Sequence, residues 1–260
     1  MQNLKKIFFP FENSSRISNI LISIFWSLFF ILLWYLFKPQ TFPSPFEVLQ
    51  GFITVFSSES FFEDFLASIF LTTKAMLFSI IIASILSYLY PIPFFKPLIE
   101  FATKCRYLTL TGLIFIFSIF SKDLSELKLW LLMFGIIPFF TDSTIGNIKE
   151  GIQDQIELAY TIKYNKWETL FETIIIGKLD KSIEVIRQNF AIAWLMITMV
   201  EGLDMSGGGL GTELLKYSKY LNLVCVFSVQ ILIFCIGLLL DFCWIKLRMV
   251  IFPYVKINEK

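Results

Sequence analysis

Long, mainly apolar runs dominate the pattern of hydrophobic and polar positions along the chain. Six of them are typical of membrane spans, because a straight helical crossing needs about 20 mainly apolar residues. They cover Ile20–Phe37, Phe65–Tyr90, Tyr107–Phe120, Leu127–Thr141, Ile183–Val200 and Leu223–Ile245. The third and fourth runs are shorter than a straight crossing, so their limits are the least defined. The pattern predicts an all-α polytopic membrane bundle of about six transmembrane helices.

Composition agrees with lipid as the solvent and excludes several kinds of chemistry. Apolar residues make up 56% of the 260 residues and charged residues 17%, whereas soluble domains have about 45–50% and about 25%. The chain has no His, which excludes His-based catalytic triads and His-ligated metal sites. Its four Cys lack a CxxC spacing, so we expect them to pack as small hydrophobes. A net charge of +1 gives no field that attracts nucleic acid.

Lys and Arg are distributed unequally between the two sets of loops. Fifteen of the 22 lie in one set and five in the other. The richer set comprises residues 1–19, 91–106, 142–182 and 246–260. The positive-inside rule therefore predicts that both termini and the 142–182 segment are cytoplasmic. No A-x-A-like cleavage site follows the first span and no linker divides the chain, so we expect one uncleaved domain over residues 1–260.

The 142–182 segment contains an amphipathic stretch. About 40 residues bury too little surface to fold as a catalytic domain, but Glu157–Ile176 has apolar residues close to helical spacing. Such a helix either lies on the lipid surface or fills a groove on a partner protein. The lysines of the segment favour lipid, whereas its acidic residues would be repelled by anionic headgroups. The charge balance favours the partner protein.

Several motifs follow one another in a fixed order along the chain. They are Phe42-Pro-Ser-Pro45, Glu47-Val-Leu49, Glu157-Leu-Ala159, Trp167, Arg187, Ala193-Trp194, Glu201, Gly209-Leu-Gly211 and Asp241. In this order and spacing, residues 40–255 resemble the inner-membrane permease of binding-protein-dependent ABC importers, and within it the nitrate/sulfonate/taurine group. The resemblance implies that Glu157, Ala159, Lys163 and Trp167 belong to a short coupling helix that docks into a groove on a separate ATPase. Ala159 would be the small residue at the closest approach.

The coupling segment departs from that family where the family has a glycine and two prolines. Lys163 stands at the glycine position, and Ile176 and Asp180 stand at the proline positions. The glycine lets the chain turn between two short helices, using backbone freedom that Lys lacks. Either the segment is therefore one continuous helix, or it turns at 163–165 with Asn165 in the unusual conformation.

Several ionisable residues lie inside the predicted spans or at their ends, and four of them are candidates for a specific role. Arg187 and Asp241 are each about one turn inside the cytoplasmic end, where a charge is costly unless it is paired or reaches water. We expect them to meet as a structural ion pair that joins the last two spans. Lys74 stands alone in the second span, where it either extends to the interface or attracts an anion in the transport pathway. Glu201 ends the fifth span on the outer side, where we expect it to be solvated.

A glycine-rich segment follows Glu201. Residues 206–211 read Ser-Gly-Gly-Gly-Leu-Gly, which fits neither the dinucleotide fingerprint nor a P-loop. Glycines between two spans allow a sharp turn or a re-entrant segment. Gly209 and Gly211, with Glu201 and Lys74, are thus candidates for a pathway or gate, and the alternative is a plain turn.

The resemblance also implies the partners. No Walker motif is present, so ATP would be hydrolysed by a cytoplasmic ABC ATPase dimer. A second permease copy would complete a homodimeric pathway in the bacterial inner membrane, and an extracytoplasmic substrate-binding protein would deliver a small anionic or heterocyclic solute. The chain itself would be a transport subunit and not an enzyme, and it would need no cofactor and no metal.

Two other functions are weaker on the sequence. A secondary transporter needs ion-coupling carboxylates near mid-membrane, and the predicted spans have Asp and Glu only near their ends. An intramembrane enzyme without His would depend on Lys74 with Ser68 or Ser79.

Overall fold

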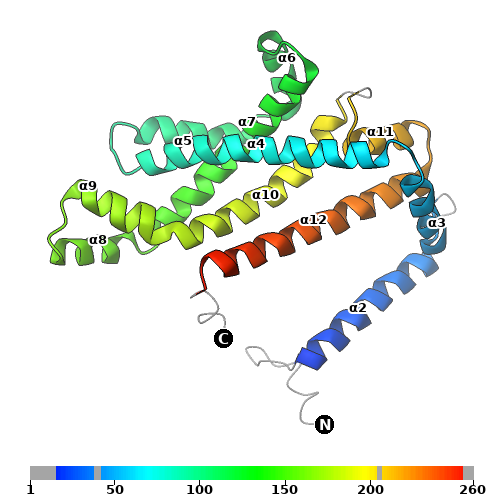
Figure 1. The fold of residues 1–260 in the computed structure, drawn as a ribbon, viewed down its shortest axis with the longest axis horizontal. Helices are drawn as coiled ribbons and strands as arrows, with labels where there is room; N and C mark the ends of the chain where they lie inside the picture. The colour runs from blue at the N-terminus through cyan, green and yellow to red at the C-terminus, as the bar shows by residue number, and fades with distance from the viewer. Residues whose placement is uncertain (1–15, 38–41, 204–206, 254–260) are drawn as a thin grey trace.

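The computed structural model describes residues 16–37, 42–203 and 207–253, and these are almost entirely helical, with no strand among them (Figure 1). The long helices are α2 (Arg16–Phe37), α4 (Phe61–Leu89), α7 (Leu124–Lys149), α10 (Leu179–Glu201) and α12 (Leu223–Ile251). The short ones are α3 (Pro45–Phe56), α5 (Lys96–Lys104), α6 (Leu110–Phe120), α8 (Ile152–Thr161), α9 (Lys166–Glu168) and α11 (Leu210–Lys219). The predicted all-α bundle is confirmed. Most of the predicted cytoplasmic segment 1–19, and the tail after residue 253, lie outside the described residues.

Five helices of the described chain are long and apolar enough to cross a membrane, as in a multi-pass membrane protein. A sixth crossing exists only if two helical segments, Lys96–Tyr107 and Leu110–Phe120, are counted as one span, although the chain bends by 113° between them. The third predicted span, Tyr107–Phe120, is therefore not a straight helix. Its helical part is the 11-residue α6, which is too short to cross a bilayer alone.

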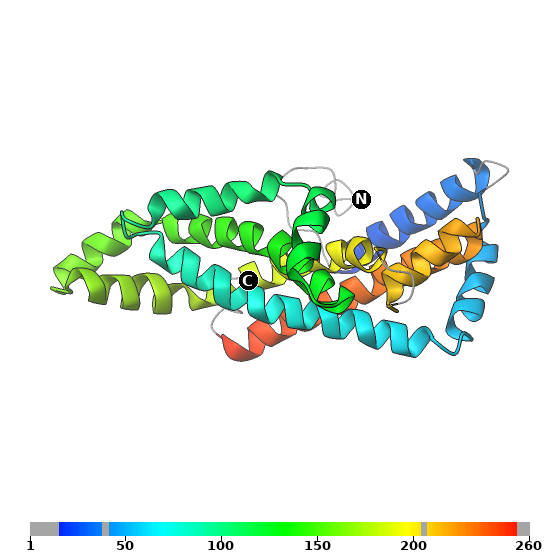
Figure 2. The ribbon, with the colours of Figure 1, turned by 90° about the horizontal axis from the view of Figure 1, so that it is seen from above.

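The 142–182 segment, expected to be a loop, is helical over most of its length. Helix α7 continues past the predicted end of its span to Lys149, and a 36-residue helical run from Lys166 to Glu201 contains α9 and α10. This run includes a π-helical stretch, Thr169–Ile175, and one 3₁₀ turn, Ile176–Lys178. Only residues 150–165 remain between the two long helices. Figures 1 and 2 both place α8 and α9 at one end of the molecule, and α3 and α11 at the other.

The core forms where α4 and α10 pack against α7. The face of α4 that is buried carries small or hydroxyl residues at helical spacing, namely Ser68, Thr72, Ala75, Ser79, Ala83 and Ser87. Large apolar residues of α4, such as Phe70 and Ile81, point outward. Small residues let two helix backbones approach closely, which is how helices associate in lipid, where apolar burial gives little driving force. α7 fills the contact with Leu131, Leu132, Ile136 and Phe140, all nearly inaccessible.

α3 packs against α12 and is defined by local signals. Ser44 accepts a hydrogen bond from the backbone N–H of Glu47, and the Glu47 carboxylate accepts one from the Ser44 N–H, which is a capping box. A side chain at Gly51 would collide with Ser228 of α12. The Ser228 hydroxyl donates to the carbonyl of Val48 over 2.8 Å, so the glycine allows this contact.

Candidate functional site

The α8–α9 hairpin (residues 150–178) contains the predicted coupling helix, and it turns at residues 162–165. The left-handed residue of the turn is Lys163, with a φ of 66°, and not Asn165 as expected. Asn165 is extended and caps the next helix, because its side-chain oxygen accepts from the N–H groups of Trp167 and Glu168. The sequence therefore provides a strong cap for the second helix, while Lys163 adopts a conformation that glycine adopts more easily.

Both arms of this hairpin carry exposed apolar side chains. Leu158, Tyr160, Ile162, Trp167 and Phe171 are each more than half exposed. Glu157 and Lys163 are exposed as well. Ala159, in contrast, is only 3% exposed, because α8 lies against the π-helical stretch of the same hairpin. The expectation that Ala159 offers the closest approach to a partner is therefore wrong, since that small residue allows the two arms of the hairpin to pack.

The base of the hairpin is closed by a buried lysine. The Lys178 ammonium donates to three carbonyl oxygens at the end of α7, those of Asn147 (2.6 Å), Ile148 (3.0 Å) and Glu150 (2.6 Å). Carbonyls at a helix C-terminus lack intrahelical partners and carry partial negative charge, so a cation there is favourable. Lys181 forms an ion pair with the Glu150 carboxylate at 2.8 Å, and this hydrogen bond holds the pKa of Glu150 below its usual value. The sequence analysis did not single out these contacts.

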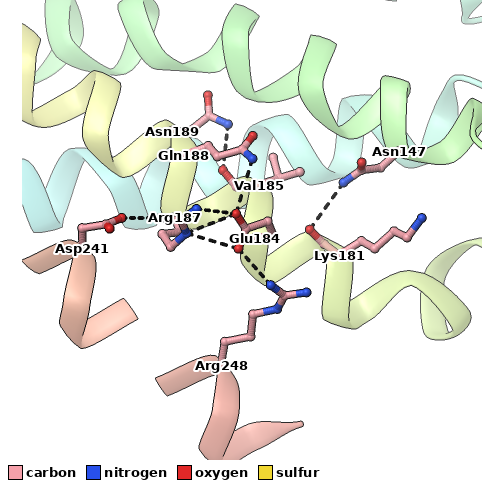
Figure 3. A network of polar contacts seen from close by, with 9 residues as sticks. All are labelled: Asn147, Lys181, Glu184, Val185, Arg187, Gln188, Asn189, Asp241 and Arg248. Carbon is pink, nitrogen blue, oxygen red and sulfur yellow. Dashed lines mark hydrogen bonds and ion pairs between the residues drawn. The ribbon is translucent and has the colours of Figure 1, made fainter. Parts of the chain in front are cut away.

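A second polar cluster joins α10 to α12 (Figure 3). Arg187 and Asp241 meet at 2.6 Å, as the sequence predicts. The pair belongs to a larger network, because Glu184 accepts from Arg187 one turn later on α10 and from Arg248 on α12 at 3.1 Å. The Glu184–Arg187 spacing of three residues is a signal for this contact that the sequence analysis overlooked. The cluster ties the two helices together at the ends that carry most basic residues.

The expectation that Glu201 is solvated is wrong, since it is 1% exposed. The glycine turn (residues 207–211) folds back over the end of α10 and covers it. One carboxylate oxygen accepts from the Ser68 hydroxyl of α4 at 2.7 Å, and the other accepts from the N–H of Gly211 at 2.9 Å. The carboxylate thus replaces water with two donors from different elements, which is how a buried charge remains compatible with folding.

A second buried carboxylate, Asp64 on α4, also binds the glycine turn. It accepts from the Gly209 N–H at 2.7 Å, while the Leu210 N–H donates to Ser68 at 2.9 Å. Three consecutive backbone N–H groups at the start of α11 are therefore satisfied by α4 and α10, which complements the positive end of that helix.

The two predicted glycines are needed for steric reasons. Gly209 has a φ of 112° and lies against the Glu201 carboxylate, where a side chain would collide. A side chain at Gly211 would strike the backbone of Thr198 in α10. Both glycines therefore permit the close contact between the turn and the helix end, and the turn is more constrained than a plain connection between two spans.

A cleft of about 290 Å³ adjoins this turn. Among its lining residues are Lys74 from α4, Glu126 and Lys128 from the first turns of α7, and Glu201. The structure therefore brings together Lys74 and Glu201, two predicted pathway residues far apart in sequence. Asp64 and Lys128 were not predicted from the sequence, and Ser68 was considered only as a partner of Lys74 in an intramembrane enzyme, although it belongs to the small-residue face of α4.

No family model matches the chain, and no curated protein matches it either. Function must therefore be argued from the arrangement of the residues. Among the described residues, no group of three or more His, Cys, Asp or Glu side chains could hold a metal ion. The candidate sites are the exposed apolar side chains of the α8–α9 hairpin and the charged cleft beside the glycine turn.

Proposed function

We propose that the chain is the transmembrane permease subunit of an ATP-driven importer for small solutes. It would form the pathway and couple to a separate ATPase, without carrying out chemistry on the solute. The exposed apolar side chains of the α8–α9 hairpin carry this proposal. A helical hairpin that extends from the end of a bundle and presents Leu158, Tyr160 and Trp167 has the form of an element that fills a groove on a partner.

The base of the hairpin supports a coupling role. Lys178 binds the end of α7, and the second arm of the hairpin continues into α10 without a break in the helix. A force on the hairpin would therefore reach two helices of the core directly. α7 leads to Lys128 and α10 leads to Glu201, and both of these residues line the charged cleft. Movement of the hairpin and access to the cleft would be linked through these two helices.

The remaining parts of the proposal concern the assembly. A pathway with alternating access would need two copies of the chain, one ATPase for each copy and an extracytoplasmic binding protein. The basic residues at the hairpin end favour a cytoplasmic location for it, with the glycine turn on the opposite side. In a bacterium this membrane would be the inner membrane.

Affinity purification tests the docking surface. The tagged chain is extracted in mild detergent, co-purifying proteins are identified by mass spectrometry, and ATP hydrolysis is measured. We expect the native chain to retain a protein with a Walker motif, and Trp167→Glu to lose it. Tyr220→Glu is the matched control, because Tyr220 is 81% exposed and directly follows α11, which lies at the other end of the molecule from the hairpin (Figure 1). Retention of the ATPase by Trp167→Glu, or absence of an ATPase from the native chain, would contradict the proposal.

The buried carboxylates favour a second candidate, an ion-coupled transporter. Glu201 and Asp64 are 1% and 5% exposed, and Glu201 lines the cleft, so carboxylates that could exchange a proton lie beside a possible solute site. Reconstitution separates the two candidates. Uptake driven by an inward proton gradient without ATP, and lost in Glu201→Gln, would favour ion coupling, whereas uptake that requires the ATPase and ATP favours the importer.

A further inference from the structure

The charged cleft between α4, the first turns of α7 and the glycine turn has a balanced set of charges. Two lysines and two glutamates line it, Lys74, Lys128, Glu126 and Glu201. Lys128 and Glu201 are 5% and 1% exposed and lie beneath its surface. Lys74 and Glu126 are exposed, so one cation and one anion are open to a solute.

The position of Lys74 points to a ligand. It lies near the middle of the 29-residue α4, one of the helices long and apolar enough to cross a membrane. Ionisable residues at such positions are costly, and they typically face a water-filled cavity and mark a solute or ion pathway. Lys74 faces a cleft that also contains polar groups of α7 and of the glycine turn.

The rest of the cleft wall is mainly apolar. Phe70 and Leu71 of α4 and Leu129 of α7 line it beside the charges. Pockets for small molecules typically combine such a wall with a few placed polar groups that fix the orientation of the ligand. A bare inorganic ion would leave this wall without a partner.

We propose that the cleft binds a small zwitterionic solute with an apolar body, of the amino-acid class, whose carboxylate pairs with Lys74 and whose ammonium pairs with Glu126. The apolar body lies on Phe70, Leu71 and Leu129. A simple anion is attracted by the lysines but repelled by the glutamates, whereas a zwitterion pairs with both signs. This site rests on the proposal that the chain carries a solute across the membrane, and it narrows the small anionic or heterocyclic solute that the family resemblance implies to a zwitterion.

Titration calorimetry on the purified full chain, with three related probes, tests the site. Leucine carries both charged groups, 4-methylpentanoate lacks the ammonium, and 3-methylbutylamine lacks the carboxylate, while all three keep the branched apolar body. We expect leucine to bind about two- to fivefold more tightly than either analogue, since each exposed charge pair contributes up to about 1 kcal/mol. In Lys74→Met leucine should bind no more tightly than the amine, and in Glu126→Gln no more tightly than the acid.

The controls separate this site from general electrostatics. Lys122→Met removes an exposed charge close by that does not line the cleft, and it should leave leucine binding unchanged. Equal binding of leucine and 4-methylpentanoate, absence of saturable leucine binding, or an equal loss in Lys122→Met would each overturn the proposal. The comparison of the three probes on the native chain tests the proposal even if a variant fails to fold. No ATPase takes part in this titration, so its failure is distinguishable from failure of the docking proposal.

Discussion

Replacing Lys178 by Met removes the cation that closes the base of the α8–α9 hairpin and keeps the length and packing of the side chain. Lys178 is 3% exposed, and its ammonium donates to three carbonyl oxygens at 2.6 to 3.0 Å. Hydrogen bonds to charged groups contribute about 1.5–3 kcal/mol each, and part of this is offset because a buried ammonium loses its hydration. We therefore expect a net loss of about 2–4 kcal/mol, which includes the cost of leaving buried carbonyls unpaired.

Amide hydrogen exchange measures this loss locally. A local destabilisation of about 2–4 kcal/mol accelerates exchange by roughly 30- to 900-fold, and we expect the acceleration at the end of α7 and over α8. Lys181→Met is the matched control, because its ion pair with Glu150 is largely exposed and exposed pairs contribute about 0–1 kcal/mol. Unchanged exchange in Lys178→Met, or an equal change in Lys181→Met, would refute the reasoning.

Three further predictions concern the glycine turn and the α8–α9 hairpin. Gly209→Ala forces a side chain against the Glu201 carboxylate at a positive φ, so the thermal midpoint should fall by an amount that corresponds to about 1–3 kcal/mol, as measured by differential scanning fluorimetry. Ala159→Arg should increase proteolysis within the hairpin, because the buried Ala159 packs against the chain's own helix. Lys181 lowers the pKa of Glu150, so their contact stabilises the fold above the usual carboxyl pKa near 4.5 and loses this effect as the pH falls below it. The difference in thermal midpoint between the native chain and Glu150→Gln should therefore shrink as the pH falls through that range.

The helical part of the fold could be predicted from the sequence because a chain in lipid has few ways to pair its backbone polar groups. Apolar runs must satisfy their backbone internally in lipid, so each long run is a helix. The run Tyr107–Phe120 was the exception, because the chain bends sharply between Tyr107 and Leu110, at the start of the run, and the pattern does not indicate this bend. The Arg187–Asp241 contact was also predictable, since two opposite charges at matching depth in adjacent spans have few other ways to be satisfied.

The candidate sites were predicted less completely because they depend on distant contacts. Ser68 lies 133 residues before Glu201, and only the three-dimensional fold shows that its hydroxyl donates to that carboxylate. The turn at residues 163–165 was foreseen as one of two alternatives, but its left-handed residue was misassigned, because the value of Asn165 as a helix cap outweighs its tolerance of positive φ. The small size of Ala159 was correctly recognised as a sign of close contact, but sequence alone does not distinguish contact within the chain from contact with a partner.

Photocrosslinking in intact cells tests the central claim most directly, that the α8–α9 hairpin contacts a separate ATPase. A photoreactive phenylalanine analogue replaces the exposed Leu158 of the hairpin or, as a control, Tyr220, which directly follows α11 at the other end of the molecule. The account predicts a crosslink from position 158 to a protein with a Walker motif, and no such crosslink from position 220. Crosslinks from position 158 to lipid or to this chain alone would contradict it.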